Sequence, residues 1–249
     1  MGEIMRNIID YTKNYMQKNF EEYQVIYRRK KILEIIKLYE HNNILEIGCG
    51  MEPLFKYLDY QDYDNMIIIE PSELFFKNAI KLSSNNSKIT CINDFFGEKV
   101  LKNKYKLNLI ICSSLLHEIE DPKNFLLNIY NICDKNTIIH INVPNANSLH
   151  RILAKEIGLI NNIYEKSNRN IKLQQREVYD IDKLSSEVER CGFKILDKGS
   201  YFIKPFSHNQ MMDMLNNNII DEHILNGFYN LEKYLPEYGS EIYVNIIKK

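Results

Sequence analysis

Between residues 43 and 143 the sequence alternates regularly between short apolar runs and amphipathic segments, and this rhythm constrains the fold more than any other feature. The apolar runs occupy residues 43–47, 65–70, 88–92, 107–113 and 136–143. Helical character is clearest over 72–82 and 121–133, where Asp121 is a candidate N-cap and Pro122 takes the first helical position. Apolar strands that alternate with helices are typical of a parallel sheet with helices on both faces. The sequence therefore predicts an α/β fold.

The rest of the chain adds two strands and three larger segments to this alternation. Residues 194–206 and 240–249 predict a sixth and a seventh strand. The stretch between the fifth strand and the helix before the sixth is too long for a simple connection, so we expect it to cover a site. The prediction is a single domain, residues 1–249, with three additions: a helical N-terminal extension at 1–40, a lid insertion at 144–179 and a helical insertion at 207–238.

Net charge and cysteine content bound the possible partners. The 249 residues carry a formal net charge of −1, which does not favour a phosphate-binding surface. Five cysteines are scattered without a CxxC pair, so neither a disulfide framework nor a zinc site is expected. The N-terminus lacks the apolar core of a signal peptide, and no apolar run is long enough for a membrane span. We therefore expect a cytoplasmic protein without a nucleic-acid or membrane partner. Its oligomeric state stays open.

The first apolar run ends in a glycine-rich turn flanked by acids. It reads NILEIGCGMEP, with Glu46 before the glycines and Glu52 after them. A dinucleotide site places a diphosphate on three glycines, but the third position here is Pro53, and two carboxylates would repel the phosphates. A ligand with a positive centre and no phosphate fits better. S-adenosylmethionine carries a sulfonium and an ammonium group, so the turn favours it over NAD.

This turn resembles the first motif of a known family, the class I S-adenosylmethionine-dependent methyltransferases of the small-molecule type. That motif is an acidic residue followed by GxG at the end of the first strand, which LEIGCG matches at Glu46, Gly48, Cys49 and Gly50. The usual third small residue is Glu52 here, a departure from the pattern. The resemblance implies a Rossmann-like sheet of seven mostly parallel strands, the last one antiparallel, and S-adenosyl-L-methionine as the cofactor.

An acid at the end of the second strand is the second match to this family. Glu70 lies 20 residues beyond Gly50 and can accept both ribose hydroxyls of a nucleoside. An acid here also suits NAD, so it does not separate the two cofactors. Pro71 and Ser72 would begin the next helix beside the adenine, unless Ser72 is only a helix N-cap.

Two further strand ends complete the resemblance. After the third strand the family often places an acid or amide near the adenine amino group and an apolar residue against the ring, which implies cofactor contacts for Asn93, Asp94 and Phe95. Asp94 could equally cap the helix that follows. At the end of the fourth strand, the resemblance places Cys112 and Ser113 beneath the cofactor.

Methyl transfer depends mainly on alignment, because a sulfonium is already a good leaving group. A hydroxyl acceptor also benefits from a general base, whereas an amine near its pKa needs little help. His117 lies one helical turn beyond Ser113, so we predict that it is the catalytic base, with His150 as its rival. The segment YRRKKILEIIK in the N-terminal extension is typical of a solvated helix face. Alternatively, Arg28 or Arg29 would reach the cofactor carboxylate from it.

No metal is predicted. Glu118, Glu120 and Asp121 are the only clustered acids near the fourth strand. Adjacent residues at a helix start point in different directions, so we interpret this cluster as a solvated acidic turn.

The segments after the fifth strand carry the substrate prediction. Their amides, cations and phenol suit a polar, hydroxyl-bearing or anionic molecule: Asn142, Asn145, His150, Arg151, Arg176 and Tyr179. The layout is similar to small-molecule methyltransferases of bacterial surface-sugar and natural-product biosynthesis. We therefore predict O- or N-methylation of a sugar, a nucleotide-sugar or a surface-glycan precursor, in polysaccharide biosynthesis. Two alternatives stay open: a catalytically inactive binding subunit with this fold, and an NAD-type oxidoreductase.

Overall fold

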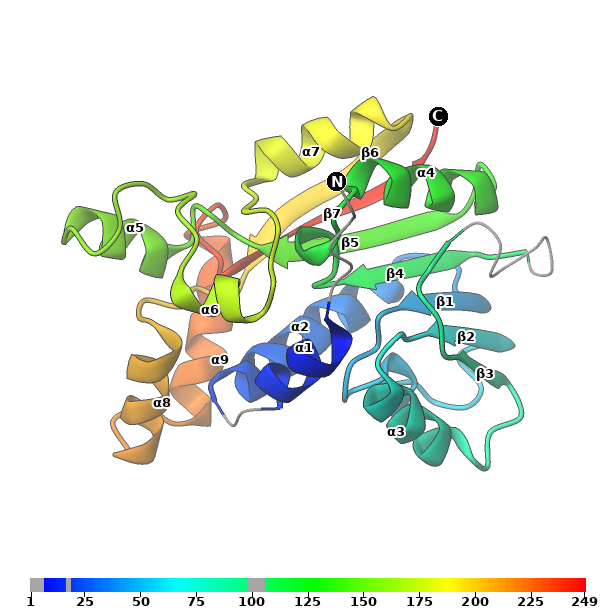
Figure 1. Ribbon diagram of the computed structural model, residues 1–249, viewed down its shortest axis with the longest axis horizontal. Coiled ribbons are helices and arrows are strands. Elements are labelled where there is room, and N and C mark those ends of the chain that lie inside the picture. The colour runs from blue at the N-terminus through cyan, green and yellow to red at the C-terminus, as the bar shows by residue number, and fades with distance from the viewer. Residues whose placement is uncertain (1–6, 17–18, 98–105) are drawn as a thin grey trace.

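The computed structural model describes residues 7–16, 19–97 and 106–249, and its centre is a seven-stranded sheet (Figure 1). The strands are β1 (Asn43–Ile47), β2 (Asn65–Ile69), β3 (Ile89–Ile92), β4 (Leu109–Ser113), β5 (Ile138–Pro144), β6 (Phe193–Tyr201) and β7 (Glu241–Lys248). They lie in the order β3-β2-β1-β4-β5-β7-β6. Only β7 runs antiparallel to its neighbours, and the other adjacent pairs are parallel. The predicted fold class, including the antiparallel last strand, is confirmed.

Helices cover both faces of this sheet and one of its ends (Figure 1). The α-helices are α1 (Ile8–Tyr15), α2 (Glu21–Ile36), α3 (Glu73–Ser83), α4 (Pro122–Ile132), α5 (Leu149–Glu156), α6 (Asn168–Lys172), α7 (Ile181–Arg190), α8 (His208–Asn216) and α9 (Glu222–Asn230). Short 3-10 helices are η1 (Leu54–Tyr57), η2 (Leu116–Glu118) and η3 (Leu231–Lys233). In the described part of the chain, no helix combines the length and apolar character needed to cross a bilayer.

Side-chain alternation along the strands divides the core into two layers. Leu45 and Ile47 point into a cluster that includes residues of α4 and α7, such as Leu126 and Leu184. Ile44 points to the opposite face, toward the cluster formed with α2, η1 and α3. Because successive strand residues point to opposite faces, Glu46 must share the face of Ile44, beneath α2.

The predicted helix boundaries are supported by capping side chains. The Asp121 carboxylate accepts a hydrogen bond from Asn124 N at 3.0 Å, and Pro122 follows at the first helical position of α4, as predicted. Ser72 caps α3 and accepts from Phe75 N. Each cap pairs a backbone N–H that would otherwise have no partner inside the helix.

Two predicted elements end earlier than their sequences suggest. The sixth strand, expected over 194–206, ends at Tyr201, because Phe202 adopts a φ of +60° that is incompatible with an extended strand. The N-terminal helix pattern near residue 36 belongs to α2, which begins at Glu21 and ends at Ile36. The turn after β6 matters for the site, because it directs the next residues inward.

An aromatic cluster joins α2 to α9 and to the turn after β6. The Tyr27 ring stacks on Phe202 at a centroid distance of 4.5 Å and on Tyr229 at 5.5 Å. These three residues are buried together with side chains of α8. Helices from the two insertions and from the N-terminal extension therefore pack at the carboxyl ends of the parallel strands, where this fold class binds ligands.

Candidate active site

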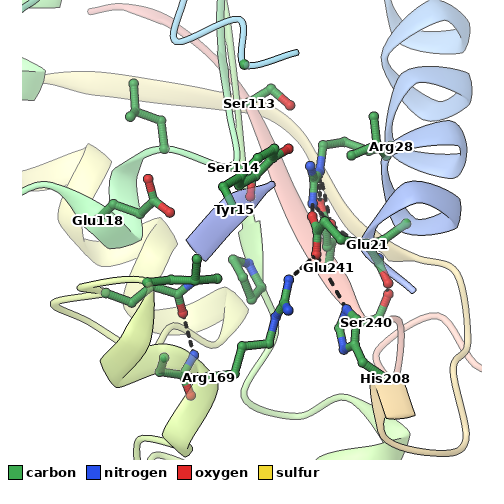
Figure 2. A pocket seen from close by; sticks show the side chains of 18 of the residues that line it. Tyr15, Glu21, Arg28, Ser113, Ser114, Glu118, Arg169, His208, Ser240 and Glu241 are labelled. Atoms are coloured by element: carbon green, nitrogen blue, oxygen red, sulfur yellow. Dashed lines mark hydrogen bonds and ion pairs between the residues drawn. The ribbon is translucent and has the colours of Figure 1, made fainter. Parts of the chain in front are cut away.

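A cavity of about 470 Å³ lies between the carboxyl ends of the strands and the helices around them. Its walls come from α1, α2, the turns after β1, β2, β4 and β5, helices α5 and α6, and the segments before α8 and β7. Figure 2 shows side chains from these distant segments converging on one space. The chain therefore assembles a single site from its strand ends, its N-terminal extension and its insertions.

The glycine turn after β1 forms one wall of the cavity. Gly48 and Gly50 have φ values of +76° and +60°, a backbone conformation that strains any residue with a Cβ. Gly48 N donates to Ile69 O at 2.9 Å, which ties the turn to β2. A Cβ on Gly50 would lie 3.7 Å from the Tyr15 hydroxyl, so helix α1 closely covers the turn. Both glycines and Cys49 line the cavity, as predicted for this motif.

Glu46 does not line the cavity, and its predicted cofactor contact needs correction. The fully buried carboxylate faces α2, where Arg29 Nη2 approaches at 2.8 Å and Leu54 N donates at 2.9 Å. Burial raises the pKa of Glu46 despite this cation. Arg29 also donates to Cys49 O at 3.3 Å and to Glu52 O at 2.5 Å. Glu46 therefore pairs with Arg29, which in turn donates hydrogen bonds to the backbone of the glycine turn.

The carboxylate of Glu52, the second acid of this turn, also points away from the cavity. Its Oε2 accepts from Lys56 Nζ at 2.5 Å and from the Tyr57 hydroxyl at 2.9 Å. The residue lines the cavity, but its carboxylate is paired outside it. The departure from a small residue at this position is therefore accommodated by turning the acid outward.

Glu70 occupies the cavity where the second strand ends. Its Oε2 accepts from Gly50 N at 3.1 Å and its Oε1 from Ser72 N at 2.8 Å, and the residue is only 5% exposed. Burial raises its pKa, and these two backbone donors act in the opposite direction. Each carboxylate oxygen has a second lone pair, so the acid is oriented and can still accept a ligand hydroxyl. Pro71 and Ser72 line the cavity beside it.

The residues predicted to contact adenine lie at the edge of the site and outside the cavity lining. Asn93 donates to Glu70 O at 2.8 Å and to Pro71 O at 3.2 Å, so it braces the turn after β2. Asp94 accepts from Phe95 N at 2.7 Å, and Phe95 is half-exposed. The adenine contacts of Asp94 and Phe95 therefore stay predictions, whereas Asn93 has a visible structural partner.

Ser113 and Cys112 are separated by the alternation of β4. Cys112 points into the core with α4 and α7 and does not line the cavity. Ser113 lines it, and its buried Oγ has no hydrogen-bond partner among the described residues. A buried hydroxyl without a partner is unfavourable, so this atom is suited to a polar ligand group.

The helical spacing predicted between Ser113 and His117 is wrong. Ser114 has a φ of +53°, and the chain continues into the 3-10 helix η2, so the two side chains do not share one helical face. His117 is 2% exposed and does not line the cavity, whereas Glu118 does. The backbone O of His117 accepts from Arg176 N at 2.8 Å, which anchors the lid segment. His117, the predicted base, therefore does not face the cavity.

Arg28 lines the cavity, and its charge is already paired. Its Nε donates to both oxygens of Glu241 at 3.0 Å, and its Nη2 lies 2.5 Å from Glu241 Oε1 and 2.9 Å from Glu21 Oε1. Figure 2 shows this guanidinium between the two acids. Burial would lower the pKa of Arg28, but Glu241 and Glu21 raise it well above its usual value. Its predicted contact with the cofactor carboxylate stays a prediction.

The predicted substrate residues divide into two groups. Asn145, His150 and Arg151 line the cavity. Asn142 is fully buried beneath it and donates to Glu241 Oε2 at 2.6 Å. Tyr179 is also fully buried and donates to Glu187, while Arg176 lies about 4.0 Å from Glu120 on the outer surface. The latter three are therefore placed away from the ligand space by their own partners.

The sequence analysis misses many of the residues that line the cavity, including five polar ones: Tyr15, Glu21, Arg169, Lys204 and His208. Arg169 Nη2 lies 2.9 Å from Glu21 Oε2, and His208 Nε2 lies 3.4 Å from the same oxygen (Figure 2). Lys204 Nζ lies 3.0 Å from His208 Nδ1. No short motif joins these residues, because they come from four separate segments. The one available signal is composition, since the insertions that carry two of them, Arg169 and His208, are polar and amide-rich.

The acidic turn near β4 does not assemble a metal site. Glu118 lines the cavity, Asp121 caps α4, and Glu120 lies at the surface. Among residues 7–16, 19–97 and 106–249, no three His, Cys, Asp or Glu side chains are grouped to hold a metal ion.

Comparison with known proteins provides evidence on the family and on the fold of the chain. A family model described as a methyltransferase domain matches residues 17–198, whereas no curated protein matches the sequence. A methyltransferase structure from Listeria monocytogenes, described as S-adenosylmethionine-dependent, has a TM-score of 0.60 at 11% identity and covers 91% of this chain and 98% of its own.

Two further solved structures extend the comparison. The plantazolicin methyltransferase BamL, in complex with a triazolic desmethylPZN analog and SAH, has a TM-score of 0.60 at 16% identity and covers 92% of this chain and 88% of its own. The (4+2)-cyclase SpnF has a TM-score of 0.59 at 14% identity and covers 88% and 79%. At such identities the likeness shows a shared fold, and the cyclase illustrates that one fold can serve different reactions.

Proposed function

The chain belongs to the methyltransferase-domain family, the class I S-adenosylmethionine-dependent methyltransferases. We propose that it methylates a small polar molecule bound beneath a helical cap, which is formed by α5, α6 and the segment that leads into α8. The observation that carries the cofactor site is the position of Glu70. Its carboxylate is buried, oriented by Gly50 N and Ser72 N, and exposed only to the cavity beside the glycine turn. An acid held in this way suits the two hydroxyls of a ribose.

The residues around Glu70 fit the rest of the same cofactor. The positive-φ glycines leave room for close backbone approach at Gly48 and Gly50. The unpartnered Ser113 hydroxyl offers a donor and an acceptor at the end of β4. When bound, S-adenosylmethionine supplies an activated methyl group on a sulfonium centre. The protein then has to hold the two reactants in line and exclude water, which is the main contribution to such a displacement.

Helix α1 is the element that excludes water from the cofactor end. The Thr12 and Ser72 hydroxyls lie 2.9 Å apart, and the Tyr15 ring packs edge-on against Phe75 at 5.5 Å. Ile8, Tyr11 and Tyr15 line the cavity, so the N-terminal extension forms its roof. A closed roof lowers the local dielectric and strengthens every polar contact inside.

The acceptor is proposed to be a sugar, a nucleotide-sugar or a surface-glycan precursor, methylated on oxygen or nitrogen. Polar side chains from the cap support a polar acceptor, because Asn145, Arg169 and His208 line the part of the cavity farthest in sequence from the glycine turn. We also propose that residues 1–249 form one methyltransferase domain. The five free cysteines, four of them buried, favour a cytoplasmic location.

Calorimetry with Glu70→Gln tests the cofactor assignment. The glutamine keeps the side-chain shape but removes the charge, so S-adenosylmethionine should bind about 10- to 150-fold more weakly, equivalent to about 1.5–3 kcal/mol for a charged hydrogen-bond partner. Glu73→Gln, at an exposed acid on α3 paired with Lys77, should bind like the parent. Equal affinity in both variants, or tighter binding of NAD than of S-adenosylmethionine by the parent, would contradict the assignment.

A turnover assay separates an enzyme from an inactive subunit. The full chain is incubated with S-adenosylmethionine and candidate sugars, nucleotide-sugars and glycan precursors, and release of S-adenosylhomocysteine is measured. Acceptor-dependent release is expected from the parent and not from Glu70→Gln at the same low cofactor concentration. Tight cofactor binding without release for any acceptor would favour the subunit.

A further inference from the structure

Lys204 is a buried amine at the cap end of the cavity. It lies in the turn between β6 and α8, is 1% exposed and lines the cavity. A buried ammonium is costly unless a counter-charge lies close to it. Among the described residues, no carboxylate oxygen lies within 4.0 Å of its Nζ, and its close polar partner is His208 Nδ1 at 3.0 Å.

The carboxylates nearest to Lys204 are already paired with arginines. Glu241 is held by Arg28, and Glu21 is shared between Arg28 and Arg169 at 2.9 Å each. Two carboxylates therefore face two guanidinium groups, and a protonated Lys204 adds one uncompensated positive charge. Burial would raise the pKa of Glu21, but Arg28, His208 and Arg169 together lower it well below its usual value, so this acid stays ionised.

Two other titratable groups around this cluster, His208 and Arg151, do not supply the missing negative charge. His208 accepts from the Lys204 ammonium at Nδ1, which leaves the ring proton on Nε2, 3.4 Å from Glu21 Oε2. Burial lowers the pKa of His208 to about 4, so its ring is neutral. On α5, Arg151 is bonded to Ile163 O and Glu165 O and is offset by the Glu165 charge.

His150 adds an unused polar atom to the same place. Its Nδ1 is buried, and no hydrogen-bond partner is found for it among the described residues. Burial and the nearby Lys204 charge lower its pKa well below the usual value, so the ring is neutral and can donate one hydrogen bond. Lys204, Arg169 and His150 all line the cavity and can present N–H groups to a ligand.

We propose that this cap end is a binding site for one anionic group of the acceptor substrate, a carboxylate or a phosphate, with Lys204 as its principal counter-charge. The inference rests on the proposed function and narrows its substrate to acceptors that carry a negative charge. One surplus positive charge matches one singly charged group. Arg169 can contribute a second charged donor while it remains paired with Glu21, because a guanidinium carries five N–H groups.

The site should take up a proton when it binds its ligand. Burial lowers the pKa of Lys204 to about 7, so near neutral pH a large share of the protein holds the amine uncharged. An anion binds the charged form and raises that pKa. Affinity should therefore fall as pH rises above about 7, and the number of protons taken up per ligand should rise from near zero well below pH 7 toward one above it.

Calorimetric titration with small anions tests the site without knowledge of the substrate. Acetate and inorganic phosphate are titrated separately into the full chain, alone and saturated with S-adenosylhomocysteine, at about pH 6 and pH 8.5, with chloride as the ionic-strength control. At least one probe should bind at the lower pH and about tenfold or more weakly at the higher, since binding requires the protonated amine. Repeating the titration in buffers of different ionisation heat counts the protons taken up.

Two variants assign the binding to Lys204. Lys204→Met should abolish it, whereas Lys155→Met, at an exposed lysine of α5, should bind like the parent. Unchanged binding of S-adenosylhomocysteine by Lys204→Met shows that this variant is folded.

Three outcomes would overturn the proposal: no binding of either anion at either pH, equal binding by Lys204→Met, which would indicate an adventitious ion only, or binding above pH 7 without proton uptake. Acetate binding without phosphate binding assigns a carboxylate, and the reverse assigns a phosphate. Failure to bind S-adenosylhomocysteine would instead count against the proposed function, while the titrations of the chain alone still decide the anion site.

Discussion

The two ends of the cavity differ in how fully their charged side chains are paired. At the glycine turn, Glu46, Glu70 and Ser72 are bonded to backbone groups or to a neighbouring arginine within a stretch of about 50 residues. At the cap end, Glu21 and Lys204 come from segments that lie far apart in the chain, and none of the described residues gives the amine a carboxylate partner. At the first end the charged groups are paired before a ligand arrives, although the buried Ser113 hydroxyl has no partner among the described residues, whereas the second end is left with an unfavourable charge. We therefore expect the glycine-turn end to contribute more to the stability of the fold, and the cap end to contribute more to the selection of the acceptor.

The largest expected effect is a gain of stability from Lys204→Met. The unfolded amine holds its proton up to about pH 10.5 and the folded one only to about pH 7, so the unfolded state binds more protons between these values, and parent stability rises with pH across that window. The buried charge should cost on the order of 5 kcal/mol at pH 6. Chemical denaturation at pH 6 and pH 9.5 should show the variant to be more stable at the lower pH and this advantage to shrink at the higher.

Lys155→Met controls for the loss of a lysine as such, because Lys155 is an exposed residue of α5. It should change stability little at either pH. A Lys204→Met variant less stable than the parent at pH 6 would mean that the amine stabilises the empty site, and the contrast between the two ends would fail.

The opposite effect is expected at the glycine turn. Arg29→Met leaves the Glu46 carboxylate buried without its cation, which should lower the free energy of unfolding by about 3–5 kcal/mol. Denaturant unfolding of the double variant Arg29→Met/Glu46→Leu should recover part of this loss, because the uncompensated charge is gone. A single variant as stable as the parent would show that Glu46 is neutral in the folded protein and that the pair does not brace the turn.

Gly50→Val tests the cofactor end for binding. A β-branched side chain strains a φ of +60° and enters the space between the turn and Tyr15, so S-adenosylmethionine should bind at least about 100-fold more weakly, equivalent to about 2.7 kcal/mol. Gly158→Val is the matched control, since Gly158 has a φ of +74° with no atom within 4 Å of the added Cβ. Calorimetry should show parent-like affinity for the control. Weak binding by both variants would trace the loss to general strain.

The smallest expected effect concerns the roof of the cofactor end. Thr12→Val removes the hydroxyl contact with Ser72 and should cost about 0.5–1.5 kcal/mol locally. Hydrogen exchange should be faster in α1, residues 8–15, and unchanged in the strands. Equal exchange in α1 of both proteins would mean that packing of Tyr15 on Phe75 suffices to hold the helix.

Local motifs explain which parts of this molecule could be predicted from its sequence. The strand–helix rhythm, the glycine turn, and the positions of Glu70 and Ser113 each depend on residues that are close in the chain. Glu46 was misplaced because the motif indicates an acid but not the face of the strand to which it points, and alternation with Ile44 decides that face. His117 was misplaced because a helical period was assumed where Ser114 forces a turn.

The cap end could not be predicted for a different physical reason. Lys204 is brought inward by the turn at Phe202, and Glu21 and Arg169 meet only after α2 and α6 pack at the same strand ends. A single lysine in a polar sequence is usually solvated, so burial is the informative property, and burial is a result of tertiary packing. Sequence pattern predicts which segments are insertions, but not which of their side chains converge.

The pairing of Arg28 with Glu241 also sets an order for events during synthesis. The two residues are 213 positions apart, so at 5–20 residues per second the arginine leaves the ribosome roughly 10–40 s before its carboxylate is made. Through that interval α2 cannot settle onto the growing sheet without burying a guanidinium that has Glu21 but not yet Glu241 as its acid partner. The first long helix to be translated is therefore expected to be among the last to dock, which leaves its apolar face available to chaperones until β7 is complete.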